Sequence, residues 1–146
     1  MYTVQVIIAQ LPAGKQEEMP LKIMHLIAGG DSGGAKTHLL DLLPRLAETE
    51  SVTLVCLGDG VLAREAMALG LEVKLLTGGF FAALRSVERL AQAADILHCH
   101  GSRANLTGAL AKGSLRCPVI STVATRKNSV SAATIQPQIT KTDSSL

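Results

Sequence analysis

Aromatic side chains are scarce in this sequence of 146 residues, which has no Trp, one Tyr and two Phe. Proteins that bind single-stranded nucleic acid commonly stack the bases on aromatic side chains, so this composition argues against that function. Excess charge of one sign is lacking too, because 14 Lys and Arg residues against 12 Asp and Glu residues leave a net charge of +2. No basic stripe is present, and we expect no nucleic-acid partner.

Cysteines and long hydrophobic runs are also few. Cys56, Cys99 and Cys117 have no paired spacing and fall on predicted strands. We interpret them as small buried residues of a reducing compartment. The apolar run 4–11 is too short to span a bilayer, and the N-terminus lacks the basic region of a secretory signal. We expect a cytoplasmic protein without a transmembrane segment, either free or peripheral at the inner face of the membrane.

Apolar residues are plentiful, at 47% of the chain, which is enough for one domain with a core. Between residues 22 and 123, short apolar runs alternate with segments of helical periodicity. The pattern predicts strands at 22–27, 52–57, 71–76, 96–99 and 118–123, and helices at 33–48, 61–69, 81–94 and 104–111. It therefore predicts an α/β fold: a Rossmann-like, doubly wound parallel sheet of five strands in the order 3-2-1-4-5, with helices on both faces. Pro44 should kink the first helix, and Gly70 should end the second in the left-handed conformation.

The two ends of the chain lack this alternation. We interpret residues 1–18 as an N-terminal extension, which is upstream sequence if translation starts at Met19. Residues 19–123 form the predicted domain. Residues 124–146 are rich in Ser, Thr and Gln, and such a composition buries too little apolar surface to offset the entropy of ordering, so we expect a disordered tail.

A glycine pair, Gly33 and Gly34, stands where the first predicted helix begins. Main-chain amides at a helix N-terminus bind anions, and glycine lets a ligand approach closely, so the pair is a candidate phosphate loop. A tight turn without a ligand is the plainer alternative. A nucleotide-binding P-loop ending in Lys36 is a third, but Ala35 stands where that motif needs glycine, and no later strand ends in the Asp that would hold magnesium.

Histidines punctuate the fourth predicted strand. His98 and His100 are two residues apart, so their side chains leave the same face. His100 is nearer the carboxyl end and is the better candidate to contact a ligand, whereas we expect His98, His25 and His38 to be structural. A third metal ligand is not evident and Cys99 points to the other face, so we expect no metal.

The turn after this strand supplies three more candidates. Ser102 is expected to cap the following helix. Arg103 would either clamp an anionic group or lie in solvent. Asn105 would hydrogen-bond either a sugar hydroxyl or the loop backbone.

Three segments together resemble the N-terminal domain of family 4 retaining glycosyltransferases of the GT-B fold. They are MHLIAGGDSGGAKTHL at 24–39, DILHCHGSRANLTG at 95–108 and PVISTV at 118–123. The resemblance covers about residues 20–123. It implies transfer of a sugar from a nucleotide-sugar donor to an acceptor in cell-envelope or polysaccharide synthesis, with no cofactor besides that donor.

The resemblance also implies roles for the candidate residues. Gly33 and Gly34 would lie close to the donor phosphates. The turn from His100 to Asn105, including Ser102 and Arg103, would lie near the acceptor. No residue of this chain is assigned as catalytic.

The sequence departs from the family after the fifth predicted strand. Where the family commonly has a Thr-x-His run with a catalytically important histidine, this chain has Thr122, Val123 and Ala124. The donor domain, with its pair of glutamates, is not recognisable. We therefore expect a partial acceptor-side domain that is inactive alone. The alternatives are a non-catalytic module that docks a separate donor-domain chain and the P-loop protein.

Overall fold

The computed structural model describes residues 19–30 and 33–122. A five-stranded sheet in the order β3-β2-β1-β4-β5 forms its centre, and every neighbouring pair of strands is parallel. The strands are β1 Lys22–Ile27, β2 Ser51–Cys56, β3 Glu72–Leu75, β4 Ile96–His100 and β5 Val119–Thr122. This order confirms the prediction from the sequence.

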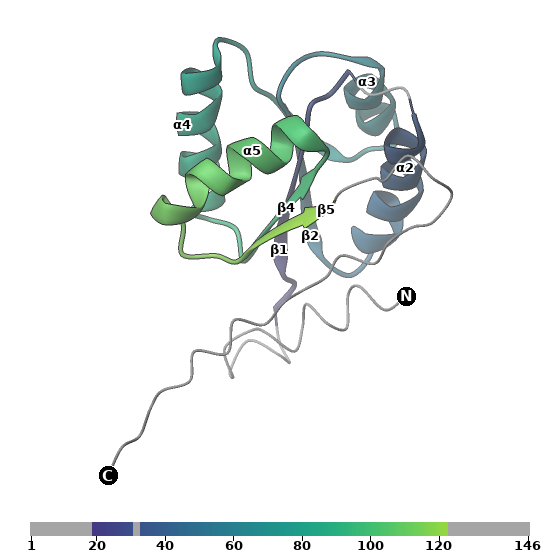
Figure 1. Ribbon diagram of the computed structural model, residues 1–146. Helices are drawn as coiled ribbons and strands as arrows, with labels where there is room; N and C mark the ends of the chain where they lie inside the picture. The colour runs from purple at the N-terminus through teal and green to yellow at the C-terminus, as the bar shows by residue number, and fades with distance from the viewer. Residues whose placement is uncertain (1–18, 31–32, 123–146) are drawn as a thin grey trace.

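Helices cover both faces of the sheet (Figure 1). They are α2 Gly34–Leu46, α3 Val61–Ala68, α4 Phe80–Ala91 and α5 Ser102–Ala111, the last followed by a 3₁₀ turn at Lys112–Ser114. In Figure 1, α2 and α3 lie on one side of the sheet, and α4 and α5 lie on the other. The fold is therefore the predicted doubly wound, Rossmann-like α/β arrangement.

The core consists of two layers, one on each face, because successive strand residues point to opposite sides. One layer places side chains such as Leu26, Leu97 and Cys99 against α4 and α5. The other places Ile27 and Leu54 against α2 and α3. Since both faces are covered, the central strands β1 and β4 are buried along almost their whole length, as is typical of parallel sheets.

Helix ends differ from the predicted boundaries where local chemistry decides them. Gly70 follows α3 with φ +79°, so the predicted left-handed residue is confirmed. The helix α2 continues past Pro44 but ends at Leu46, two residues before the predicted end. Pro44 therefore stands in the last turn, where the missing N–H costs little more than one helical hydrogen bond.

The cysteines behave as small buried residues. Cys56, Cys99 and Cys117 form no disulfide with one another, and the first two are fully buried. Burial raises the pKa of the Cys99 thiol to about 12, so this group stays protonated at neutral pH.

No helix among the residues described has the length and apolarity needed to cross a lipid bilayer. The interpretations of residues 1–18 and of the segment from Val123 to Leu146 lie outside the described residues.

Candidate functional site

Two strand-to-helix turns meet at the carboxyl edge of the sheet. Strands β1 and β4 are neighbours, and the last residue of β1, Ile27, pairs with the last residue of β4, His100. Helix α2 follows the first strand and α5 follows the second, so their N-termini project from the same edge. Ligands of open parallel sheets bind at this edge, where adjacent crossovers diverge to opposite faces. The structure thus brings the glycine pair and the turn after His100 to one region.

The glycine pair is open. Gly33 is the N-cap residue of α2, in extended conformation with φ −102°, and its carbonyl accepts a hydrogen bond from the Lys36 amide at 3.0 Å. A Cβ added at Gly33 or Gly34 would meet no described atom within 4 Å. The first turn of α2 contains no acidic residue that would compensate its positive dipole end. The fold itself does not need glycine at these two positions, and the exposed amides can accept an anion.

Other glycines of the same edge are required by packing. Gly29 has φ +91°, and a Cβ on it would collide with the carbonyl oxygen of Gly58. A Cβ on Gly60 would collide with the carbonyl oxygen of Gly29. The turn after β1 and the turn after β2 are therefore in backbone contact, and this contact fixes where the chain leaves β1 on its way to Gly33.

Lys36 does not point back to the glycine pair. Its Nζ lies 2.9 and 3.1 Å from the two carboxylate oxygens of Glu65 on α3, and the lysine side chain is only 20% exposed. In a P-loop, the lysine at this position contacts the nucleotide phosphates. The ion pair ties α2 to α3 instead, which disfavours the P-loop alternative.

Three histidines gather on one face of β1 and β4; we call His25, His98 and His100 the histidine cluster. His25 and His98 pair across the two strands. The Nδ1 atom of His25 lies 3.0 Å from Nε2 of His100, and Nε2 of His98 lies 2.7 Å from the Thr122 hydroxyl. The rings of His98 and His100 have centroids 4.1 Å apart. The side chains of all three are buried.

This arrangement bears on two expectations. His25 and His98 are buried and hydrogen-bonded within the sheet, as expected of structural residues. His100 was expected to contact a ligand, yet it is only 5% exposed and hydrogen-bonds to His25. His98 and His100 are two residues apart, so their side chains leave the same face of β4. The His100 ring therefore lies beside the neighbouring strand β1, which carries His25.

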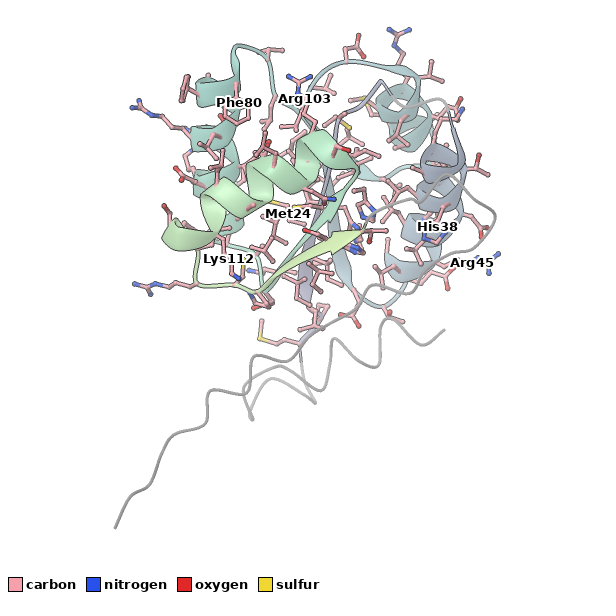
Figure 2. The ribbon with its side chains drawn as sticks, in the orientation of Figure 1. Met24, His38, Arg45, Phe80, Arg103 and Lys112 are labelled. Atoms are coloured by element: carbon pink, nitrogen blue, oxygen red, sulfur yellow. The ribbon has the colours of Figure 1, made fainter. Side chains whose placement is uncertain are left out.

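Burial keeps the histidine cluster uncharged. It lowers the pKa of His25 to about 3, of His98 to about 4 and of His100 to about 2. Neighbouring imidazoles lower each pKa further: His98 acts on His25, His38 acts on His98, and His98 acts on His100 with smaller effects from His25 and His38. His38 itself is exposed on α2 (Figure 2). At neutral pH the three imidazoles are therefore neutral, and each has one nitrogen that carries a proton and one that carries a lone pair.

The turn after β4 is organised by Gly101 rather than by Ser102. Gly101 is the N-cap residue, with φ +83°, and Ser102 is already the first residue of α5 with no side-chain capping bond. The prediction that Ser102 caps this helix is therefore wrong, because glycine one residue earlier takes the left-handed turn that ends the strand. The Ser102 side chain is exposed at the carboxyl edge.

The two remaining candidates of this turn differ: Arg103 is exposed, whereas Asn105 is held by a hydrogen bond. Arg103 is exposed at the first turn of α5 (Figure 2). Asn105 donates from Nδ2 to the carbonyl oxygen of Thr122 at 3.2 Å, which is the backbone contact allowed for in the sequence. Its Oδ1 is buried and has no hydrogen-bond partner in the described part of the chain.

The third histidine of the cluster was missed by reasoning from the sequence. His25 was treated alone, although it stands on the strand that pairs with β4. The predicted strand order makes the two strands neighbours, and this order could have predicted that His25 lies near His98.

A pocket of about 280 Å³ lies at the other end of the strands. It is bounded by the amino-terminal residues of the first three strands and by the end of α4, including Lys22, Ser51, Glu72 and Arg89. None of the candidate residues lines it.

The comparisons with known proteins agree with this geometry. The profile of Glycosyltransferase Family 4 matches residues 32–129, more than half of the chain. The chain belongs to this family. Among curated protein sequences, no significant match is found.

Solved structures from two organisms superpose on this chain. Anabaena Alr3699/HepE in complex with UDP and glucose superposes with a TM-score of 0.60 at 21% identity, covering 68% of this chain and 28% of that one. A glycosyltransferase from Rickettsia africae superposes with a TM-score of 0.59 at 16% identity, covering 71% and 30%. The chain therefore spans less than a third of the length of these proteins, and the likeness establishes the fold.

Proposed function

We propose that this chain is the acceptor-side part of a glycosyltransferase that transfers a sugar from a nucleotide-sugar donor to a cell-envelope or polysaccharide acceptor. Membership of Glycosyltransferase Family 4 supports sugar transfer. Anabaena Alr3699/HepE has been solved with UDP-glucose, which supports a nucleotide sugar as the donor. The donor domain would be supplied by another polypeptide segment, and without it the chain would transfer no sugar.

The observation that carries the proposal is the openness of Gly33 and Gly34. Neither has a positive φ, and a side chain at either would meet no described atom within 4 Å, so folding alone does not call for glycine. Glycine at a helix N-terminus does suit the close approach of a diphosphate to backbone amides. In this proposal the donor diphosphate binds there, and the leaving group gains stabilisation from the amides and the dipole of α2.

The acceptor would lie beside the turn after β4. Ser102 and Arg103 are exposed at the same edge and supply a hydroxyl and a planar cation for hydrogen bonds to sugar hydroxyls or an anionic group. His100 is buried and Asn105 is half-buried, and both would act by holding this turn against β1 and β5. A catalytically silent module that docks a separate donor-domain chain would use the same edge.

Phosphate binding is the direct test. We expect inorganic diphosphate to shift the NMR signals of the amides from Gly33 to Ala35, with a Kd no tighter than about millimolar because one helix terminus contributes only on the order of 1 kcal/mol. Gly34→Val should abolish the shifts by placing a branched side chain in the path of the anion. Gly113→Val is the matched control, because Gly113 is equally open but lies beyond the far end of α5.

Substitution of Lys36 distinguishes the proposed diphosphate site from a P-loop. Lys36→Ala should leave diphosphate binding nearly unchanged, because the ammonium group is held by Glu65. If the amides from Gly33 to Ala35 do not respond to diphosphate, and the chain binds ATP in a manner that needs Lys36, the P-loop reading replaces the proposal.

Sugar transfer is tested with the purified chain and UDP-glucose. We expect no transfer and no hydrolysis above that of the Gly34→Val variant prepared in the same way, which controls for contaminating enzymes. Turnover that Gly34→Val removes would show that the chain is active alone. It would contradict the proposal that the chain is inactive without a donor domain, but it would support a role for the glycine pair.

A further inference from the structure

We propose that the histidine cluster, His25, His98 and His100, is a binding site for a divalent transition-metal ion, with Zn²⁺ as the best match. The imidazole nitrogens offered by these residues all lie within 4.8 Å of one another. This inference does not depend on the proposed function, because it concerns a different ligand and is tested by metal uptake, not by phosphate binding or sugar transfer.

The spacing of the nitrogens suits a tetrahedral ion. Zinc binds histidine nitrogen at 2.0–2.1 Å, so two ligands of one tetrahedral ion stand roughly 3.4 Å apart. His25 Nδ1 and His100 Nε2 are already 3.0 Å apart. Adjacent strands hold the two residues through the β1–β4 ladder. Small rotations of the rings, rather than movement of the backbone, would bring the third histidine to the same point.

The chemical state of the cluster favours a metal over a proton. Binding requires neutral imidazole, and the three rings are buried, which disfavours their charged form. Imidazole is a ligand that suits zinc, copper and nickel, whereas Mg²⁺ and Ca²⁺ prefer oxygen.

The surroundings supply support for one ligand and leave a coordination position open. The Thr122 hydroxyl holds Nε2 of His98 at 2.7 Å, so a bond from Nδ1 of that ring to the metal would leave the orientation of the ring fixed by Thr122. Three protein ligands leave the fourth position of a tetrahedral zinc for water or an anion. His100 is the last residue of β4, so this open position would face the carboxyl edge.

The test is titration of the full chain, freed of metal, with Zn²⁺ and with Co²⁺. We expect one ion per chain by calorimetry, competition between the two metals, and tetrahedral visible bands for Co²⁺; Mg²⁺ should not compete. His98→Gln and His100→Gln should each weaken binding by at least about tenfold. His38→Gln is the matched control, because His38 is the one other histidine of the chain and is exposed on α2. Cys117→Ser, which removes the most accessible thiol, should also leave binding unchanged.

A second measurement uses the unaltered chain, so its result does not depend on whether the variants fold. Long-range ¹H–¹⁵N NMR of the four imidazoles should show three of them shifting together on addition of Zn²⁺ while the fourth stays in place. No uptake from excess Zn²⁺, or uptake that depends on His38 or Cys117, would overturn the proposal.

Discussion

Glycines at the carboxyl edge of the sheet differ in whether a side chain would fit in their place. Gly29 and Gly60 let two backbone turns touch, and any side chain on them would overlap a carbonyl group. Gly33 and Gly34 face open space. Packing thus requires glycine at the first two positions but not at Gly33 and Gly34, and stability measurements can separate the two cases.

Gly60→Ala should destabilise the fold, because its methyl group would be driven into the Gly29 carbonyl and the two turns would have to separate. Overpacking of this kind costs about 1–3 kcal/mol in the free energy of unfolding. Gly34→Ala should change it by less than about 1 kcal/mol, since it adds a methyl group in open space at the start of a helix. Urea unfolding followed by circular dichroism measures both. Equal losses would refute the distinction.

Acid should destabilise the protein through the histidine cluster. Above pH 6.5 these imidazoles are neutral in both the folded and the unfolded chain, so they add no pH dependence. Below pH 6.5 the unfolded chain binds protons that the folded chain, with its pKa values lowered to between about 2 and 4, does not bind. The free energy of unfolding should therefore fall as the pH drops from 6.5 toward 4, approaching about 4 kcal/mol per pH unit for three protons.

Urea unfolding at a series of pH values, with a chelator present, measures this slope. His38→Gln should change it much less than a substitution within the cluster, because His38 is exposed and acts on the cluster only as a neighbouring charge. His98→Asn should reduce it by about one third, since one of three groups no longer titrates. Stability that is flat between pH 7 and 5 would show that the cluster is accessible to protons in the folded state.

At the scale of elements, the order of strands could be predicted, but the contacts between them could not. Apolar runs separated by helical periodicity dictate parallel crossovers, so the order β3-β2-β1-β4-β5 followed from the sequence. The pairing of His25 with His98 depends on the register between β1 and β4, which are far apart in the chain. Ser102 was misplaced for a local reason, because Gly101 has φ +83° and takes the capping position.

The contact of α5 with the sheet depends on one small residue. Gly108 lies inside α5, where alanine normally stabilises a helix, but a Cβ there would collide with the Cys99 sulfur and meet a Val119 methyl at 3.3 Å. Gly108→Ala should therefore destabilise the protein by about 1–3 kcal/mol despite its better helix propensity. Adding Cys99→Ala should restore part of this loss, so that the double variant is more stable than the sum of the single changes predicts. Strict additivity in urea unfolding would mean that α5 simply shifts away from β4.

At the scale of the whole molecule, the fold was predictable and the site only in outline. The motifs around Gly33 and His100 were correctly placed at one edge because both follow neighbouring strands. Which side chains are exposed there could not be read from the sequence: His100 is buried and Arg103 is exposed. Exposure depends on how strands and helices pack together, and a single sequence contains no direct record of that packing.

The described residues contain a two-layered core, although the chain spans less than a third of the length of the solved structures that it resembles. Both large apolar clusters are formed within residues 21–122, and each of the five strands finds its partners there. We therefore expect a chain shortened to residues 19–123 to unfold in one cooperative step, with a free energy within about 1 kcal/mol of the full chain and an unchanged dependence on urea. Chemical unfolding of the two chains side by side, with analytical ultracentrifugation to exclude association, makes the comparison. A shortened chain that aggregates or unfolds without a cooperative transition would show that residues 1–18 or 124–146 complete the core, and the boundaries of the domain would then have to be redrawn around them.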